Sequence, residues 1–193
     1  QTLRALDQAK FLRANHYAPK NVLDIGASSG LLLDTFRQEF GAGVTGIEPG
    51  NAYRAAAEKR DIQMFSSLEN LLETNHNTFD LVTMMHVLEH LPKPVETLRE
   101  IRQSLLTSNG ALLLEVPNFY AHDSFELAHL SCFTPHSLKE ILRLAGYEIQ
   151  AFRKHGHPRS KTLDLYIGAL ARPIIPEHEP GPVHHERCVP LKR

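Results

Sequence analysis

The stretch VLDIGASSG, residues 22–30, has the pattern of a short apolar strand that runs into a glycine-rich turn. The apolar residues end at Gly26, and a second glycine, Gly30, follows four residues later. Both glycines let the backbone approach a ligand without a clash of Cβ. In an open α/β sheet, ligands bind beyond the carboxyl ends of the strands. The stretch therefore predicts an α/β fold with a ligand-binding site at this turn.

The spacing of the glycines limits which ligands the turn can hold. A dinucleotide fingerprint needs glycines at relative positions one, three and six, and counting from Gly26 the later two positions hold Ser28 and Leu31. A phosphate-binding loop that ends in Gly-Lys-Ser/Thr is excluded as well, because no lysine follows Gly30. The carboxylate of Asp24 would repel a pyrophosphate, but it suits the ammonium group of a methionine moiety.

Strand-like and helix-like segments alternate from residue 21 to about residue 149, which predicts a parallel sheet covered by helices. We expect parallel strands over residues 22–25, 44–47, 62–65, 79–85 and 111–116, and helices over residues 31–40, 52–59, 95–106 and 135–145. Ser28 or Ser29 is placed to cap the first of these helices, and Thr134 is placed to cap the last. Asn109-Gly110 is a usual exit from the third.

The pattern changes towards the end of the chain. Residues 147–152 and 163–170 both have strand character, and their short connection, residues 153–161, predicts an antiparallel hairpin. We expect residues 118–133 to form a cap before the last helix, and residues 1–20 to form a helix over the ligand side. The proline-rich residues 173–193 are expected to be a flexible tail or linker, so that the folded domain spans residues 1–172.

An acidic residue, Glu48, stands at the tip of the second predicted strand, 22 residues after Gly26. A carboxylate about 20 residues beyond the first turn is placed to accept both hydroxyls of a ribose. The strand, the turn and Glu48 together resemble the class I methyltransferases that depend on S-adenosylmethionine (SAM), over most of residues 10–172. The resemblance implies a Rossmann-like seven-stranded sheet of order 3-2-1-4-5-7-6 with strand 7 antiparallel. It also implies SAM as the cofactor and S-adenosylhomocysteine (SAH) as its product.

The resemblance implies cofactor-binding positions along the carboxyl edge of the first four strands: Asp24, Gly26, Ser28, Gly30, Glu48, Ser67, Leu68 and His86. Ser67 and Leu68 would border the adenine, and His86 would lie near the methionine part. For Leu68, a plain core contact is an equally good interpretation. Ser28 departs from the family pattern, since many members carry glycine there.

Two further stretches narrow the resemblance: residues 79–91, FDLVTMMHVLEHL, and residues 128–149, AHLSCFTPHSLKEILRLAGYEI. Both are similar to the methyltransferase subgroup of sugar, ubiquinone-type and secondary-metabolite pathways. The subgroup implies a small-molecule or carrier- or nucleotide-linked acceptor, with a sugar among the options. The cap and the loop over residues 153–161 are the segments that should define this acceptor.

Histidines near the cap are the candidates for proton transfer. Methyl transfer is an in-line displacement, for which alignment alone can contribute ~7–11 kcal/mol. An oxygen or carbon acid must also lose a proton, and histidine suits this role because its ordinary pKa is near ~6.5. His129 and His90 are the candidate bases, with His86 third. His90 can instead fix its loop through a hydrogen bond to the backbone.

A different interpretation uses the same residues as metal ligands. His86, Glu89 and His90 would share one face of a helical turn, and His129 would complete a set of three imidazoles and one carboxylate. This set resembles the metal-dependent methyltransferases that modify the 3′-terminal 2′-hydroxyl of small RNAs, although His86 stands where these carry an acid. We prefer the interpretation without a metal, because a net charge of −1 gives no basic surface for RNA.

The composition is that of one ordinary globular domain, with 193 residues of which 42% are hydrophobic and 22% charged. Nucleic acid is not an expected partner, and no apolar run approaches the ~20 residues of a membrane span. With two distant cysteines, Cys132 and Cys188, a reducing, cytoplasmic compartment is the simpler expectation. A non-catalytic SAM-binding module of a larger polypeptide stays open as a second class, because the chain starts with Gln1 and ends in the proline-rich segment.

Overall fold

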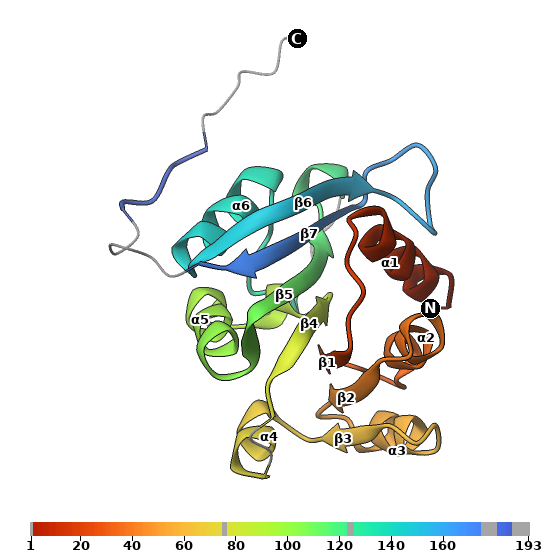
Figure 1. Ribbon diagram of the computed structural model, residues 1–193. Helices are drawn as coiled ribbons and strands as arrows, with labels where there is room; N and C mark the ends of the chain where they lie inside the picture. Colours follow the sequence, from red (N-terminus) through yellow and green to blue (C-terminus); the bar gives the residue numbers. More distant parts are fainter. Residues whose placement is uncertain (1, 75–76, 123–125, 175–180, 187–193) are drawn as a thin grey trace.

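The computed structural model describes residues 2–74, 77–122, 126–174 and 181–186. Its centre is a seven-stranded sheet in the order β3-β2-β1-β4-β5-β7-β6 (Figure 1). The strands are β1 (Asn21–Ile25), β2 (Gly43–Ile47), β3 (Gln63–Phe65), β4 (Phe79–Met85), β5 (Leu106–Pro117), β6 (Tyr147–His155) and β7 (Tyr166–Pro173). β1 to β5 pair in parallel, whereas β7 is antiparallel to both β5 and β6. The predicted strand order and the antiparallel seventh strand are therefore confirmed.

Helices cover both faces of this sheet (Figure 1). They are α1 (Thr2–Ala14), α2 (Leu31–Phe40), α3 (Asn51–Glu58), α4 (Leu68–Thr74), α5 (Pro94–Ser104) and α6 (Pro135–Leu144), with two short 3-10 turns, η1 (Leu88–His90) and η2 (Phe119–Ala121). One apolar cluster takes Leu12 from α1 and Phe36 from α2. The cluster on the other face takes Leu71 from α4, Leu98 from α5 and Leu138 from α6.

The central strand β4 is buried from both sides, as its almost continuous apolar sequence predicts. Leu81 belongs to the cluster under α1 and α2, whereas Val82 and Met84 belong to the cluster under α4 to α6. All three side chains are fully buried, and each such burial stabilises the fold by roughly 1.5–3 kcal/mol. Thr83 lies on the same face as Leu81, because side chains alternate along a strand. Its hydroxyl thereby reaches β1.

The N-terminal helix is shorter than predicted. It ends at Ala14 and does not continue to residue 20. His16 has a left-handed backbone with φ 55°, which a continuing helix cannot accommodate. The amide of Tyr17 then bonds back to the Leu12 carbonyl.

Several other boundaries also differ from the prediction. Asn109-Gly110 lies inside β5 and is not a helix exit, because an irregular register between β4 and β5 absorbs the additional residues. β6 continues to His155, which pairs with Tyr166 at the start of β7, so the hairpin loop spans residues 156–165 and not residues 153–161. The short helix α4 had no counterpart in the prediction.

The predicted helix caps have opposite outcomes. Thr134 caps α6 as predicted, in a reciprocal pair with Ser137. The serine cap of α2 was wrong. Gly30 occupies the N-cap position with a left-handed backbone, φ 75°, and no side chain accepts a hydrogen bond there. Ser28 also has a left-handed backbone, φ 49°, which turns it away from a capping geometry.

Part of the C-terminal segment lies along α6. Arg143 donates to the carbonyl oxygens of Gly181 and Pro182, and the amide of His184 donates to Glu140 at 2.7 Å. Residues 175–180 and 187–193, including Cys188, lie outside the described residues. The flexible tail therefore stays a prediction.

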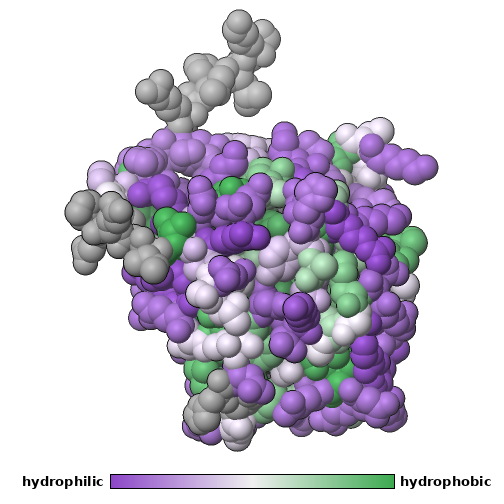
Figure 2. All heavy atoms as spheres, viewed as in Figure 1, coloured by the Kyte–Doolittle hydropathy of each residue, from purple (hydrophilic) through white to green (hydrophobic). Residues whose placement is uncertain are grey.

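On the face of the molecule shown in Figure 2, hydrophilic residues predominate, with apolar residues scattered among them. Within the described residues, no helix has the length and apolar character that a membrane crossing requires.

Candidate functional site

The glycine-rich turn after β1 forms one wall of a cavity of about 120 Å³. α1 lies over this cavity and contributes three of its lining residues. The lining residues come from α1, the end of β1 and its turn, the start of α2 and the end of β4: Arg4, Ala5, Gln8, Asp24, Gly26, Ala27, Ser28, Ser29, Leu31, Leu32 and Met85. Three of the predicted cofactor-binding residues, Asp24, Gly26 and Ser28, therefore meet at one place.

The two glycines of the turn are needed for different contacts. Gly26 has φ 79°, and a Cβ there would clash with Cγ2 of Val87, in the loop after β4. Gly30 has φ 75°, and its Cβ would meet Ile62 at 2.6 Å and Ala57 at 3.0 Å. Gly26 thus keeps the cavity turn close to the β4 loop. Gly30 lets α2 pack against the neighbouring α3 and β3 region and does not line the cavity.

Asp24 places a nearly dry carboxyl group in this cavity. It is 3% exposed and accepts a hydrogen bond from the Thr83 hydroxyl at 2.6 Å. Burial raises the pKa of Asp24 to about 7; the Thr83 hydrogen bond opposes this rise and the nearby Glu48 carboxylate adds to it. A cation that enters the cavity would stabilise the ionised form of this buried carboxyl group.

Glu48 stands beside the turn but outside the cavity lining. Its Oε2 accepts from the Ser28 amide at 2.9 Å, and its Oε1 accepts from the Gly50 amide at 2.8 Å. These two bonds fix the orientation of the carboxylate. Because each carboxylate oxygen has two lone pairs, both oxygens can still accept one more donor.

The other predicted cofactor positions lie further along the same edge of the sheet. Ser67 accepts from the Asn70 amide at 3.2 Å at the start of α4, and Leu68 packs against the core while partly exposed. Ser67, Leu68 and His86, like Glu48 and Gly30, are not part of the cavity lining at the turn.

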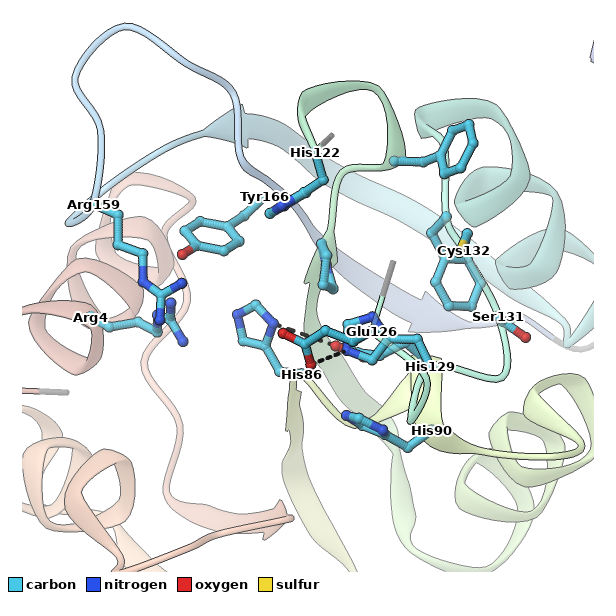
Figure 3. A pocket seen from close by; sticks show the side chains of 14 residues that line it. Arg4, His86, His90, His122, Glu126, His129, Ser131, Cys132, Arg159 and Tyr166 are labelled. Carbon is cyan, nitrogen blue, oxygen red and sulfur yellow. Dashed lines mark ion pairs between the residues drawn. The ribbon is translucent and has the colours of Figure 1, made fainter. Parts of the chain in front are cut away.

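A second cavity, of about 260 Å³, lies under the cap at the carboxyl ends of β4 and β5 (Figure 3). Its lining is rich in histidine and arginine: Arg4, His86, Glu89, His90, Pro117, Phe119, His122, Glu126, His129, Ser131, Cys132, Phe133, Arg159 and Tyr166. The cap reaches back to η1 through the Ser131 amide, which donates to the Glu89 carbonyl. Arg4 lines both cavities, so the two adjoin.

His86 faces the second cavity and not the first. Its backbone is left-handed, φ 58°, which turns the ring from the end of β4 towards β5. Nε2 lies 3.2 Å from Glu115 and Nδ1 lies 3.4 Å from Glu89. Burial alone would lower the pKa of His86, but the interactions with Glu115 and Glu89 outweigh it and raise the pKa. With a carboxylate near each ring nitrogen, His86 is poorly placed to accept a proton from a substrate.

Glu115 is a buried charge that the sequence analysis missed. It is fully buried on β5, and it accepts hydrogen bonds from Gln8 on α1 and from His155 on β6 in addition to His86. Arg4 and Arg153 lie 3.7 and 3.8 Å away. Burial would raise the pKa of Glu115, but the hydrogen bonds from His155 and His86 hold it below its ordinary range. Its partners are far apart in sequence, so no local motif signals them.

Three of the predicted chemical groups meet at the other side of the second cavity. Ligand atoms of Glu89, His90 and His129 lie within 4.8 Å of one another. Glu89 is 1% exposed, and neither of its oxygens accepts a hydrogen bond within the described part of the chain. His90 Nδ1 lies 2.9 Å from the Ala128 carbonyl. Since a carbonyl only accepts, that nitrogen carries the proton and Nε2 of the neutral ring is left free.

His129 and His90 lie ring against ring, with centroids 4.9 Å apart. His129 Nε2 also lies 3.3 Å from the exposed carboxylate of Glu126 (Figure 3). Two imidazoles and a buried carboxylate fit the donor set of a transition-metal ion, although Oε1 of this carboxylate also lies 3.4 Å from His86 Nδ1. His86, the fourth member of the metal set considered from the sequence, is not in this group.

The sheet order, the glycine-rich turn and the acidic tip of β2 define the class I SAM-dependent methyltransferase fold, and SAM is the cofactor of this class. A family model described as "Methyltransferase domain" matches residues 2–151. The chain belongs to this methyltransferase family.

Similar proteins agree with this assignment. A ubiquinone biosynthesis O-methyltransferase of Pseudomonas aeruginosa is 33% identical over 108 residues, which are 52% of this chain and 46% of that protein. The chain thus spans about half the length of the curated relatives it matches. A SAM-dependent methyltransferase of Clostridium acetobutylicum has the same fold, with a TM-score of 0.69 at 10% identity over 89% of this chain and 92% of that chain. So does 1,6-didemethyltoxoflavin-N1-methyltransferase of Burkholderia thailandensis with bound 1,6-didemethyltoxoflavin and SAH, with a TM-score of 0.69 at 22% identity over 88% and 77% of the two chains.

Proposed function

We propose that this chain transfers the methyl group of SAM to an oxygen of a small-molecule acceptor, either free or linked to a carrier or nucleotide. The observation that carries the proposal is the pair of adjoining cavities that share Arg4. One contains a carboxyl group suited to an ammonium, and the other contains histidines suited to proton transfer. The choice of oxygen is supported by the name of the Pseudomonas aeruginosa relative, an O-methyltransferase.

In this proposal, the cavity at the turn holds the methionine end of SAM. Asp24 pairs with the ammonium group, and the Arg4 guanidinium supplies a positive charge for the carboxylate. A cavity of about 120 Å³ is smaller than a pocket for a whole cofactor, which spans ~300 Å³ or more. The nucleoside therefore lies along the open edge, with its ribose hydroxyls on Glu48 and its adenine near Ser67 and Leu68.

The acceptor occupies the second cavity, with its hydroxyl group near His129 and His90. His90 has a free Nε2, because Nδ1 donates to the Ala128 carbonyl. His129 comes from the cap and reaches the same place. Either ring can take the hydroxyl proton as the oxygen attacks the methyl carbon in line with the departing sulfur.

The first experiment measures SAH binding by calorimetry and SAH production from SAM with a panel of phenols, catechols and sugar derivatives. Micromolar SAH binding with turnover of at least one hydroxylated compound is expected. Tight SAH binding without turnover of any acceptor would instead favour the non-catalytic module. Absence of SAH binding would contradict the proposal as a whole.

The group formed by Glu89, His90 and His129 favours a second candidate, methyl transfer assisted by a divalent metal. The supporting observation is the buried Glu89 carboxylate, whose two oxygens accept no hydrogen bond from any described residue and whose Oε1 lies 3.4 Å from His86 Nδ1. A bound metal would supply a Lewis acid that lowers the pKa of the acceptor hydroxyl. An RNA acceptor, considered from the sequence, draws no support from the net charge of −1.

Elemental analysis of the purified protein tests the second candidate. Stoichiometric Zn²⁺ or Mn²⁺, and loss of turnover with EDTA that the same ion reverses, would support it. The matched variant is Glu89→Gln, which keeps the shape and removes the charge. Activity that is insensitive to chelator and a metal content equal to that of Glu89→Gln would exclude it.

A further inference from the structure

One side of the second cavity holds a buried hydroxyl group that has no hydrogen-bond partner among the described residues. Tyr166 is 2% exposed, and its Oη forms no hydrogen bond with any residue that the structure describes. Such groups are rare, because buried polar atoms are nearly always hydrogen-bonded. In Figure 3, the hydroxyl of Tyr166 points to the side of the cavity where Arg159 and Arg4 enter. The unpaired hydroxyl group of Tyr166 therefore lies on the positively charged side of the cavity.

Arg159 brings an uncompensated charge to the same side. It comes from the loop between β6 and β7, and among the described residues it forms no ion pair. Arg153, on β6, does have a counter-charge, because the Asp7 carboxylate lies 2.9 Å from its guanidinium. Arg4 is also engaged: it lies 3.7 Å from Glu115 and 4.8 Å over the Tyr166 ring. Of the two arginines that line the cavity, the exposed Arg159 has no counter-charge within the described part of the chain.

Neither the acids that line this cavity, Glu89 and Glu126, nor the nearby Glu115 supplies that counter-charge. Glu115 is already surrounded by Gln8, His86 and His155. Glu126 lies on the side of His90 and His129, away from Arg159 (Figure 3), and Glu89 groups with the same two histidines. An anionic group next to Tyr166 and Arg159 would thus meet a donor and a positive charge without displacing an existing ion pair.

We propose that Tyr166 and Arg159 bind an acidic group of the acceptor, a carboxylate or a phosphate. The Tyr166 hydroxyl donates one hydrogen bond to this group, and the planar fork of Arg159 donates a pair. The inference rests on the proposed function and narrows its acceptor to hydroxylated molecules that also carry an acid. The hydroxyl to be methylated then lies at the opposite side, near His129.

The carboxylate of SAM is a rival occupant of the same position, because Arg4 lines both cavities. For this reason Arg4 is left unchanged in the test. The variants are Arg159→Ala and Tyr166→Phe. Lys161→Ala is the matched control, because it removes a positive charge from the same loop at an exposed residue that does not line the cavity.

The experiment titrates benzoate, phenyl phosphate and neutral phenol into the full chain, with and without saturating SAH, and measures their affinities by calorimetry. We expect at least one of the two acids to bind about tenfold more tightly than phenol. The acid with the higher affinity then shows whether the site prefers a carboxylate or a phosphate. Arg159→Ala and Tyr166→Phe should each weaken the acid about fivefold or more and leave phenol unchanged. Lys161→Ala should match the wild type, and urea midpoints should verify that each variant is folded.

Equal affinities for phenol and the acids, or equal effects of Arg159→Ala and Lys161→Ala, would overturn the proposal. So would weaker SAH binding in Arg159→Ala and Tyr166→Phe without a change for the acids, because the position would then belong to the cofactor carboxylate. Failure of the proposed function has a different signature, namely no SAH binding by the wild-type protein. The titrations without SAH still test the acid site in that case.

Discussion

The Thr83 hydroxyl donates a hydrogen bond of 2.6 Å to the Asp24 carboxyl group, and this bond joins β4 to β1 inside the sheet. It holds a titratable group at the wall of the turn cavity, where burial raises the pKa of Asp24 to about 7. Two consequences can be measured: one for cofactor affinity and one for stability.

Affinity for SAH should rise with pH until Asp24 is ionised. Below a pKa of about 7, the neutral carboxyl group cannot form an ion pair with the ammonium of the ligand. The affinity should therefore increase by up to about tenfold per pH unit below this pKa and level off above it. Calorimetry between about pH 5.5 and 8.5 on the wild type and Asp24→Asn tests this. An identical pH dependence in the two proteins would show that another group is responsible.

Stability without cofactor should show the opposite trend. In the folded protein the pKa of Asp24 is raised from 3.8 to about 7, so the folded state retains a proton that the unfolded chain releases. The stability associated with the neutral group is complete below about pH 4 and is lost as the pH rises towards 7. Asp24→Asn should exceed the wild type by about 2–4 kcal/mol above pH 7, and the two should converge near pH 4, as measured by urea unfolding. A less stable Asp24→Asn protein at pH 8 would contradict this assignment.

Gly26→Ala should damage both stability and SAH binding. The new Cβ would clash with Val87 Cγ2 on a left-handed backbone, so we expect a loss of about 2–5 kcal/mol in the free energy of unfolding. Gly41→Ala is the control, because Gly41 has φ 68° but a Cβ added there would meet nothing within 4 Å. It should lose only about 1–2 kcal/mol, from backbone strain, and keep its SAH affinity. Similar losses in both variants would rule out the steric contact with Val87.

Glu115→Gln should be strongly destabilising although it keeps the side-chain shape. It removes the negative charge that faces His86 and His155, leaving buried groups without compensation, at a cost of about 3–5 kcal/mol. Glu39→Gln, which breaks the partly exposed pair with Arg13, should cost about 1 kcal/mol or less. Urea unfolding of the two variants measures the difference.

The wild type and Glu115→Gln should also differ in how their stability changes at acidic pH. The pKa of Glu115 is held below its ordinary value of 4.5, so its contribution is present above that pH and is lost as the pH falls through the lowered pKa. Glu115→Gln should therefore lose less stability than the wild type on acidification below about pH 4.5. Parallel acid curves would place the stabilising role elsewhere.

His129→Ala should lower kcat by about 10²–10⁴ with the SAH affinity unchanged, if His129 is the base. His136→Ala is the control, since that ring lies on α6 against the His184 carbonyl and outside both cavities. An unchanged rate in His129→Ala together with a slow His90→Ala protein would assign the base to His90. Unchanged rates in both variants would remove histidine from the proton transfer.

The elements of the fold and of the site that the sequence could predict are those determined by residues close together in the chain. The strand Asn21–Ile25, its turn and Glu48 follow from local pattern and spacing, and the strand order followed from the resemblance that these residues carry. The Thr134 cap was likewise predicted from its position directly before Pro135, and the structure adds its partner Ser137 three residues away.

The parts that sequence missed depend on contacts between distant segments. Gln8 and Glu115 are separated by 107 residues, and Arg4 became a site residue only when α1 folded over both cavities. The wrong serine cap has a conformational cause, since the left-handed backbones of Ser28 and Gly30 depend on packing beyond the turn. His86 was expected near the methionine part of the cofactor, and the structure adds its contact with Glu115 at 3.2 Å and its place in the lining of the second cavity.

The cap leaves and rejoins the fold at adjacent points. Asn118 bridges to Phe133, and the Phe119 amide bonds to the Phe133 carbonyl at 2.8 Å. A loop closed at its base can gain or lose residues for a small entropic cost, roughly 0.6 kcal/mol per doubling of its length. The register between β5 and β7 lies outside that closure and is not altered. Under the proposed function, evolution or a protein engineer could exchange this loop to admit a new acceptor and leave the turn that carries Asp24 and Gly26 unchanged.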